Sequence, residues 1–180
     1  MKKIDTKNKM FSNNKFHELK GSSLTKEMKM KFANYICRDN LFEIYYIRIE
    51  NKNINNQLYS NKARAFNYII GLSLLHNINN NNLPIKDDFI LNIDERNVKT
   101  QSINTLEEYL NIKLGIEHEL IDDLKVKYYD SSNNNIIQIS DFFSNLYYSK
   151  LMTKGTYNKL FKDLEQKGYI KDFFYFPRNN

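Results

Sequence analysis

Three carboxylates stand at points of the sequence where one structural element is expected to give way to another. Glu18 lies at the junction of an extended segment and a helix, Asp94 ends an apolar strand, and Asp141 lies where an apolar run turns into a helix. Converging carboxylates are what Mg²⁺ needs, because it is a hard cation that takes oxygen ligands and keeps several waters. Two such ions can activate a water and stabilise the leaving oxygen in phosphodiester hydrolysis. The three acids are therefore candidates for metal-assisted hydrolysis.

Each acid also has an ordinary structural interpretation. Glu18 could form a surface ion pair with Lys20, and such a pair contributes little stability. Asp94 could cap the turn after its strand, and Asp141 could be an acid that the helix dipole favours near a helix N-terminus. Taken singly, these interpretations are the more common ones, and spacing alone does not establish a metal site.

The elements that must position these acids alternate along the chain between helix and strand. Apolar residues at helical spacing predict helices over about 24–38, 60–77, 97–115, 138–152 and 157–164. Apolar and alternating runs predict strands over about 41–50, 89–94 and 124–129, and an aromatic tail at 173–176 that docks as a strand or a core plug. This alternation indicates an α/β fold. Ligands of open α/β sheets bind at the carboxyl ends of strands, so Asp94 is the best-placed single acid.

Several details of these elements follow from local chemistry. Ser23 is expected to cap the first helix. The strand 89–94 is nearly all apolar and is expected to be central, whereas the alternating lysines of 124–129 predict an edge strand with its lysines outward. Gln138 and Asp141 are three residues apart, so we expect them to share one side of a helix near its N-terminus.

Composition predicts a folded chain with a basic balance. The 180 residues suit a polar arm over residues 1–15 followed by a single domain over 16–180. The hydrophobic share is 41%, with 13 Tyr and 12 Phe, which is enough to build a core. The formal net charge of +6 permits a nucleic-acid or other anionic partner without demonstrating one.

The sequence shows no signal peptide, no membrane-spanning segment and no zinc-type ligand spacing. The first residues lack the apolar core of a signal peptide, and no apolar segment approaches the ~20 residues that span a bilayer, so we expect a cytoplasmic protein with no membrane partner. Cys37 is the only cysteine and is expected to be a small buried hydrophobe. His17, beside Glu18, could contact a phosphate, whereas His76 is expected to be a satisfied core histidine.

Three short segments, in this order, resemble a bacterial family known as domain of unknown function 3800, which is grouped with the RNase H-like fold. They are His17-Glu18-Leu19-Lys20-Gly21-Ser22, Ile93-Asp94-Glu95-Arg96 and Ile137-Gln138-Ile139-Ser140-Asp141-Phe142. The resemblance implies an RNase H-like mixed sheet flanked by helices. It implies Glu18, Asp94 and Asp141 as ligands of Mg²⁺ or Mn²⁺ and as the catalytic set. It also implies that Lys20 and Gln138 lie near the substrate phosphate, where His17 would join them.

The sequence departs from the family pattern at its beginning. Members of that family open with a strand ending in Asp-Glu-Ser-Gly, whose Asp is a further metal ligand, and nothing similar precedes Phe16. We therefore expect an N-terminally truncated form of the fold. The loss of a central strand would leave an exposed sheet edge and uncovered apolar faces. An isolated chain of this kind is expected to be marginally stable, to form a homodimer, or to bind a partner chain that supplies the strand.

The resemblance implies a metal-dependent nuclease that hydrolyses phosphodiester bonds in nucleic acid, impaired by the missing strand. The alternative is a catalytically inactive remnant of the family, acting as an interaction module of a bacterial defence or mobile-element system. A lysine-rich surface would serve either function, so charge does not separate them. A nucleotide-binding protein is disfavoured because the sequence has no Gly-rich phosphate loop.

Overall fold

The computed structural model describes most of the chain, in two compact units. The described residues are 21–39, 41–50, 52, 54, 58, 60–84, 88–95 and 103–177. Unit 1 comprises Met1–Ile44 and Ser131–Ile170, and unit 2 comprises Tyr45–Asp130 and Lys171–Asn180. Each unit is described by itself.

Unit 1 is built around one long helix, α6 (Asn135–Met152). Asn134 caps it, because its side-chain oxygen accepts hydrogen bonds from the backbone N–H groups of Ile136 and Ile137. The buried positions of α6 recur at helical spacing and form an apolar stripe: Ile137, Phe142, Phe143, Leu146 and Tyr147.

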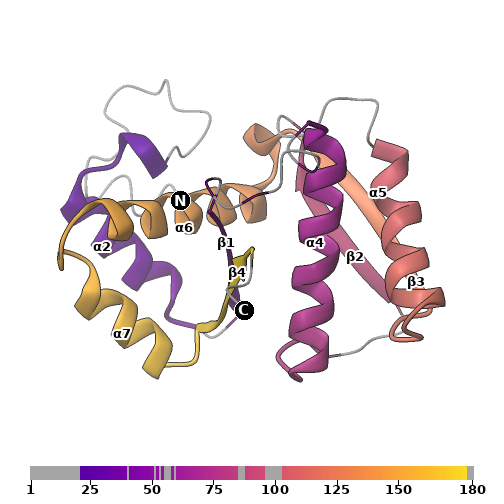
Figure 1. The fold of residues 1–180 in the computed structure, drawn as a ribbon. Helices are drawn as coiled ribbons and strands as arrows, with labels where there is room; N and C mark the ends of the chain where they lie inside the picture. The colour runs from indigo at the N-terminus through magenta and orange to yellow at the C-terminus, as the bar shows by residue number, and fades with distance from the viewer. Residues whose placement is uncertain are drawn as a thin grey trace. The chain divides into compact units, whose positions relative to one another are not determined.

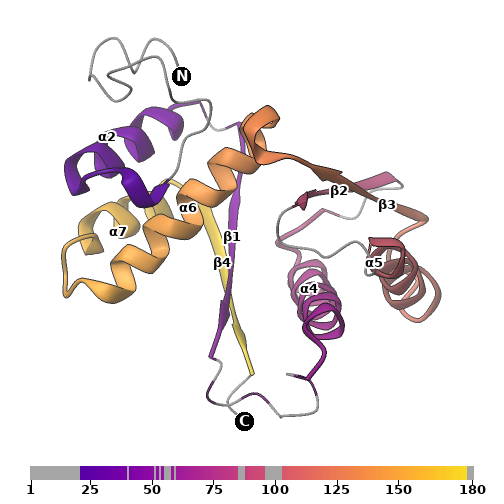
Figure 2. The same ribbon diagram turned by 90° about the horizontal axis from the view of Figure 1, so that it is seen from above.

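Two shorter helices, α2 (Lys26–Ile36) and α7 (Asn158–Gln166), lie along α6 (Figures 1 and 2). The ring of Phe32 in α2 meets that of Phe142 edge-on, with centroids 4.7 Å apart. On α7, the ring of Phe161 lies 5.8 Å from that of Tyr147. A single 3₁₀ turn, η1 (Gly21–Ser23), precedes α2 and packs on α6.

Unit 2 contains a parallel β–α–β unit. Strands β2 (Asp88–Asp94) and β3 (Asp123–Tyr129) pair in parallel, with Asp88 opposite Asp123 and Asp94 opposite Tyr129. Helix α5 (Ile103–Leu110) joins them and continues into a π-helical segment, η5 (Asn111–Ile116) (Figure 2). The long helix α4 (Lys62–Asn79) packs against α5. The buried core of this unit consists of Ile93, Leu106, Leu110, Leu114, Ile121 and Leu124.

A second parallel pair is formed by β1 (Ile44–Ile49) and β4 (Ile170–Phe176). The backbone N–H of Ile44 donates to Tyr169 O, and that of Glu50 donates to Phe176 O, so the two strands run in the same direction. Phe174 and Phe176 of β4 form a small buried cluster with Ile69 of α4. The prediction that the aromatic tail docks as a strand is therefore confirmed.

The α/β class predicted from the sequence is confirmed, because the described residues combine helices with two parallel strand pairs. The edge strand with outward lysines is confirmed as well, since Lys125 and Lys127 of β3 are exposed. An RNase H-like arrangement and a single domain over 16–180 stay predictions. Among the described residues, none of the helices combines the length and the apolar composition needed to cross a bilayer.

Three local predictions were wrong. The cap of α2 is Thr25, whose side chain accepts from Met28 N, and Ser23 belongs to the preceding turn. Among the described strands β2 pairs only with β3, and alternate residues of β2 are exposed, so it is not covered on both faces as a central strand would be. Helix α6 begins at Asn135, because the Asn134 cap brings the apolar run into the helix. Asp141 therefore lies in its second turn, beyond the first-turn position at which the helix dipole favours an acid.

Candidate functional site

The six residues predicted to form a site fall in different parts of the chain. Glu18, His17 and Lys20 lie outside the described residues. The described ones are Gln138 and Asp141 in unit 1 and Asp94 in unit 2. The structure therefore does not show whether the three predicted metal ligands converge.

Gln138 faces the interior of unit 1. Its side chain is 3% exposed, and Nε2 donates hydrogen bonds to Ser131 O at 2.8 Å and Ser132 O at 3.3 Å. These bonds tie α6 to the 3₁₀ turn before it, η6 (Ser131–Asn133). Asp141, one turn further on, is exposed, so the two side chains do not share a surface as their spacing suggested. The role of Gln138 near a substrate stays a prediction.

Asp94 is the last residue of β2 and is half-buried. It lies opposite Tyr129, the last residue of β3, and Asp130 follows directly. Two acids thus stand at the carboxyl ends of adjacent parallel strands. This is the edge at which open α/β sheets bind ligands.

In unit 1, Gly21 brings the chain directly onto α6. A Cβ atom at Gly21 would lie 2.8 Å from Asn145 Cβ and 3.3 Å from Phe142 Cα, so only glycine allows this approach. Asp141 immediately precedes Phe142 on that turn of the helix. Glu18 precedes Gly21 by three residues, and three residues span at most about 11 Å. The position of Glu18 relative to Asp141 falls outside the described residues.

A buried amine on the same face of α6 was missed by sequence reasoning. Lys29 of α2 is 7% exposed, and its Nζ donates to Asn145 Oδ1 at 2.7 Å and to Ser149 Oγ at 2.8 Å. Burial lowers the pKa of this amine from its ordinary value of 10.5. The sequence signal was weak: Asn145 and Ser149 are two polar residues four positions apart, and α6 contains several other polar residues.

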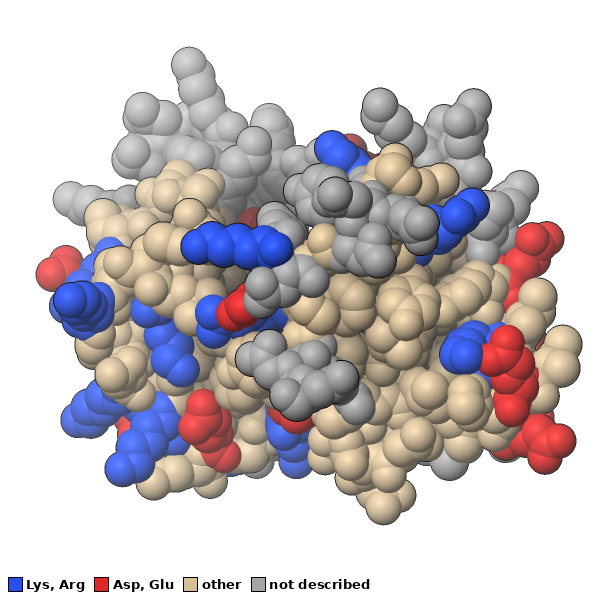
Figure 3. Space-filling view, in the orientation of Figure 1, with Lys and Arg blue, Asp and Glu red and all other residues tan. Residues whose placement is uncertain are grey.

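Positive charge is concentrated in unit 1. Its residues include 15 Lys and Arg against 8 Asp and Glu, a formal charge of +7, whereas unit 2 has 12 against 13, a formal charge of −1. Lys and Arg side chains gather over α2 and α7 on the face seen in Figure 3. Lys159, Lys162 and Lys167 at α7 are all exposed. An anionic partner would therefore be attracted to unit 1 in preference to unit 2.

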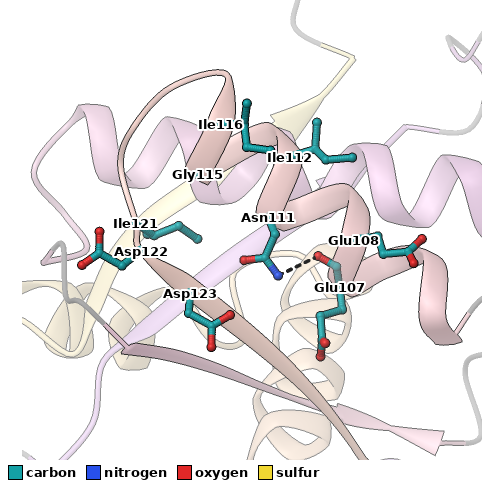
Figure 4. Close-up of a pocket in the computed structure, with 9 residues that line it drawn as sticks. All are labelled: Glu107, Glu108, Asn111, Ile112, Gly115, Ile116, Ile121, Asp122 and Asp123. Carbon is teal, nitrogen blue, oxygen red and sulfur yellow. Dashed lines mark hydrogen bonds between the residues drawn. The ribbon is translucent and has the colours of Figure 1, made fainter.

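Unit 2 contains an open pocket of about 690 Å³ beside α5 and η5 (Figure 4). Its four acids are Glu107, Glu108, Asp122 and Asp123, and their carboxylates point in different directions. Glu107 is engaged already, since its Oε2 accepts from Val126 N at 2.7 Å. Among the described residues, these acids do not form a group arranged to hold a metal ion.

His76 was predicted to be a satisfied core histidine, and the structure confirms that it is paired. Its Nε2 lies 3.0 Å from Oδ2 of Asp172 in β4, and its Nδ1 lies 3.0 Å from Asn80 Nδ2. This arrangement joins α4 to β4.

The described residues do not by themselves fit a metal ion. Within them, no group of three or more His, Cys, Asp or Glu residues is arranged to hold one. The predicted ligand set needs Glu18, outside the described part, together with Asp94 and Asp141 from separate units.

The chain matches no protein-family model, no curated protein and no solved structure. Membership of the family that the three motifs resemble stays a prediction.

Proposed function

We propose that the chain is a nuclease-like protein that hydrolyses phosphodiester bonds in nucleic acid, with Mg²⁺ or Mn²⁺ held by Glu18, Asp94 and Asp141. The observation that carries the proposal is the close approach of Gly21 to α6 at Phe142 and Asn145. It fixes Gly21, which follows Glu18 by three residues in the sequence, beside Phe142, the residue after Asp141.

Two further observations support the proposal. Asp94 is half-buried at the carboxyl end of a parallel strand, which is where α/β sheets place ligand-binding residues. The excess positive charge of unit 1 would attract the phosphate backbone of a nucleic acid, and Lys20 belongs to that unit. A bound divalent ion would supply the activation of water and the stabilisation of the leaving oxygen.

Calorimetric titration with Mn²⁺ tests the ligand set directly. Wild type is compared with Asp94→Asn and Asp141→Asn, and with Asp163→Asn as the control, because Asp163 lies on α7 and does not belong to the predicted set. Saturable binding that the first two substitutions each weaken at least tenfold, with the control unchanged, is the expected result. Equal binding by all four folded proteins, or no binding by wild type, would contradict the proposed metal site.

A matched assay measures phosphodiester hydrolysis on labelled single-stranded and double-stranded DNA and RNA. Cleavage is expected in Mg²⁺ or Mn²⁺ and not in a chelator, and Asp94→Asn is expected to abolish it. Activity that persists in Asp94→Asn would assign the cleavage to a contaminant or to other residues.

An interaction module is a second candidate, favoured by the exposure of Ile90. This side chain is 51% exposed on β2, and β2 has one partner among the described strands. An exposed strand edge beside an apolar side chain is a template for pairing with another chain. Light scattering after size-exclusion chromatography would reveal a dimer, which Ile90→Lys should dissociate and Lys127→Arg should not. A monomer at all concentrations would eliminate this candidate as a self-associating module.

A further inference from the structure

The interface between α2 and α6 contains a buried charge with only neutral partners among the described residues. The Nζ of Lys29 is held by Asn145 Oδ1 and Ser149 Oγ. Burying an ammonium group without a carboxylate is costly, and the two hydrogen bonds offset part of that cost. Its two acceptors are one turn apart on α6, and Asn145 is in turn one turn beyond Asp141.

The bond to Lys29 fixes the orientation of the Asn145 amide. An amide group is planar, so when Oδ1 faces Lys29 the two N–H bonds of Nδ2 point away from it. Lysine can only donate, which makes the reverse orientation unfavourable because two donors would then face each other. Asn145 is half-exposed and its Cβ lies against Gly21. Its Nδ2 is therefore available on the face of α6 that carries Asp141 and meets η1.

We propose that Asn145 donates a hydrogen bond through Nδ2 to a phosphate oxygen of a bound nucleic acid, and that Lys29 is the positioning residue that holds the amide in that orientation. The inference rests on the proposed function, because it names a substrate contact of the same site. Side-chain amides of Asn and Gln are regular phosphate donors, and such contacts bind the backbone without reading sequence. Net positive charge on unit 1 favours the approach of that backbone.

The substitution Asn145→Asp distinguishes a phosphate contact of Asn145 from a purely structural role of this residue. A carboxylate at this position keeps the acceptor for Lys29 and forms an ion pair with it, so the α2–α6 interface is preserved or strengthened. It replaces the Nδ2 donor by a second acceptor that repels phosphate. A purely structural role therefore predicts unchanged or higher stability with unchanged affinity, whereas a phosphate contact predicts a loss of affinity.

The experiment measures fluorescence anisotropy of a labelled single-stranded oligonucleotide in a chelator, where cleavage does not occur, together with thermal melting of each variant. The matched control for charge is Asn34→Asp, at an exposed position on α2 in the same unit. We expect Asn145→Asp to raise the Kd by about tenfold or more without lowering the Tm, since a hydrogen bond to a charged group is lost. Asn34→Asp should change the Kd by less than about threefold, the effect of one added surface charge.

Two further variants test the positioning role. Lys29→Met removes the amine, so the Asn145 amide can rotate, and it is expected to raise the Kd several-fold. Ser149→Ala removes the other acceptor and leaves the Lys29–Asn145 bond, so its Kd should stay within about twofold of wild type. If Asn145→Asp binds the oligonucleotide as tightly as wild type does, this inference is overturned and the proposed function is not. Absence of oligonucleotide binding by the wild-type protein would overturn the proposed function together with it.

Discussion

The side chain of Asn111 pairs with the backbone of Leu124 as a neighbouring strand would. Asn111 Oδ1 accepts from Leu124 N at 2.8 Å, and Asn111 Nδ2 donates to Leu124 O at 2.8 Å and to Glu107 O at 3.1 Å. Glu107 Oε2 continues the pattern by accepting from Val126 N. Backbone groups of every second residue in a strand point toward the same edge, so those of Leu124 and Val126 face one edge of β3. The side chains of Asn111 and Glu107 occupy the hydrogen-bonding positions of that edge.

Asn111→Ala should destabilise unit 2 by about 2–4 kcal/mol, because it leaves two backbone groups of the buried residue Leu124 without their side-chain partner. Urea denaturation followed by circular dichroism measures the effect. Asn92→Ala, at an exposed position on β2, is the control and should stay within about 0.5 kcal/mol of wild type. Equal midpoints for the two variants would show that solvent replaces the Asn111 bonds at little cost.

Gly71→Ala should destabilise the protein, although Gly→Ala within a helix ordinarily stabilises it by about 1 kcal/mol. The reversal of sign is expected because a Cβ atom at Gly71 would lie 2.8 Å from Tyr109 Cε1, where α4 and α5 meet. Thermal melting of Gly71→Ala, Tyr109→Leu and the double variant measures the coupling. The double variant should be more stable than Tyr109→Leu alone. Independent effects of the two substitutions would contradict this account of the glycine.

Gly21→Ala should weaken Mn²⁺ binding by at least tenfold without altering any proposed ligand. The added methyl group cannot lie 2.8 Å from Asn145 Cβ, so η1 must move away from α6 and take the preceding segment with it. Calorimetry measures the affinity, and melting shows whether the variant is folded. Ser22→Ala, at the exposed neighbouring position, should bind as wild type does. A folded Gly21→Ala variant that binds Mn²⁺ with wild-type affinity would show that the approach of Gly21 to α6 does not matter for the proposed metal site.

The thiol of Cys37 should react slowly with disulfide reagents at pH 8. Burial raises its pKa from 9.0 to about 11, so little thiolate is present in the folded protein. Reaction with a chromogenic disulfide should accelerate at least tenfold in urea. Because the folded pKa is raised, this group's contribution to stability is complete below about pH 9 and is lost as the pH rises toward 11. Over that range wild type should therefore lose stability relative to Cys37→Ala, and an identical pH dependence would refute the shift.

Hydrophobic periodicity was sufficient to predict most helices and strands of this chain. The apolar spacing around Phe142 and Leu146 predicted α6, and the alternation of Lys125 and Lys127 predicted the edge strand β3. Helix ends were less well predicted. A cap depends on one local side-chain conformation, and Thr25 and Asn134 compete with neighbouring residues of equal capping propensity.

The sequence by itself determined the elements, the concentration of lysine in part of the chain and the three candidate acids, because these depend on residue type and short-range spacing. Only the tertiary structure decided that Asn111 closes an edge of β3, that Lys29 is buried against Asn145, and that Gly21 touches α6. The first two contacts join residues 13 and 116 positions apart. No periodicity encodes such pairs, since each arises where two elements meet and a buried polar group must find a partner. The proposed phosphate contact of Asn145 depends on one such pair, the bond between Lys29 and Asn145.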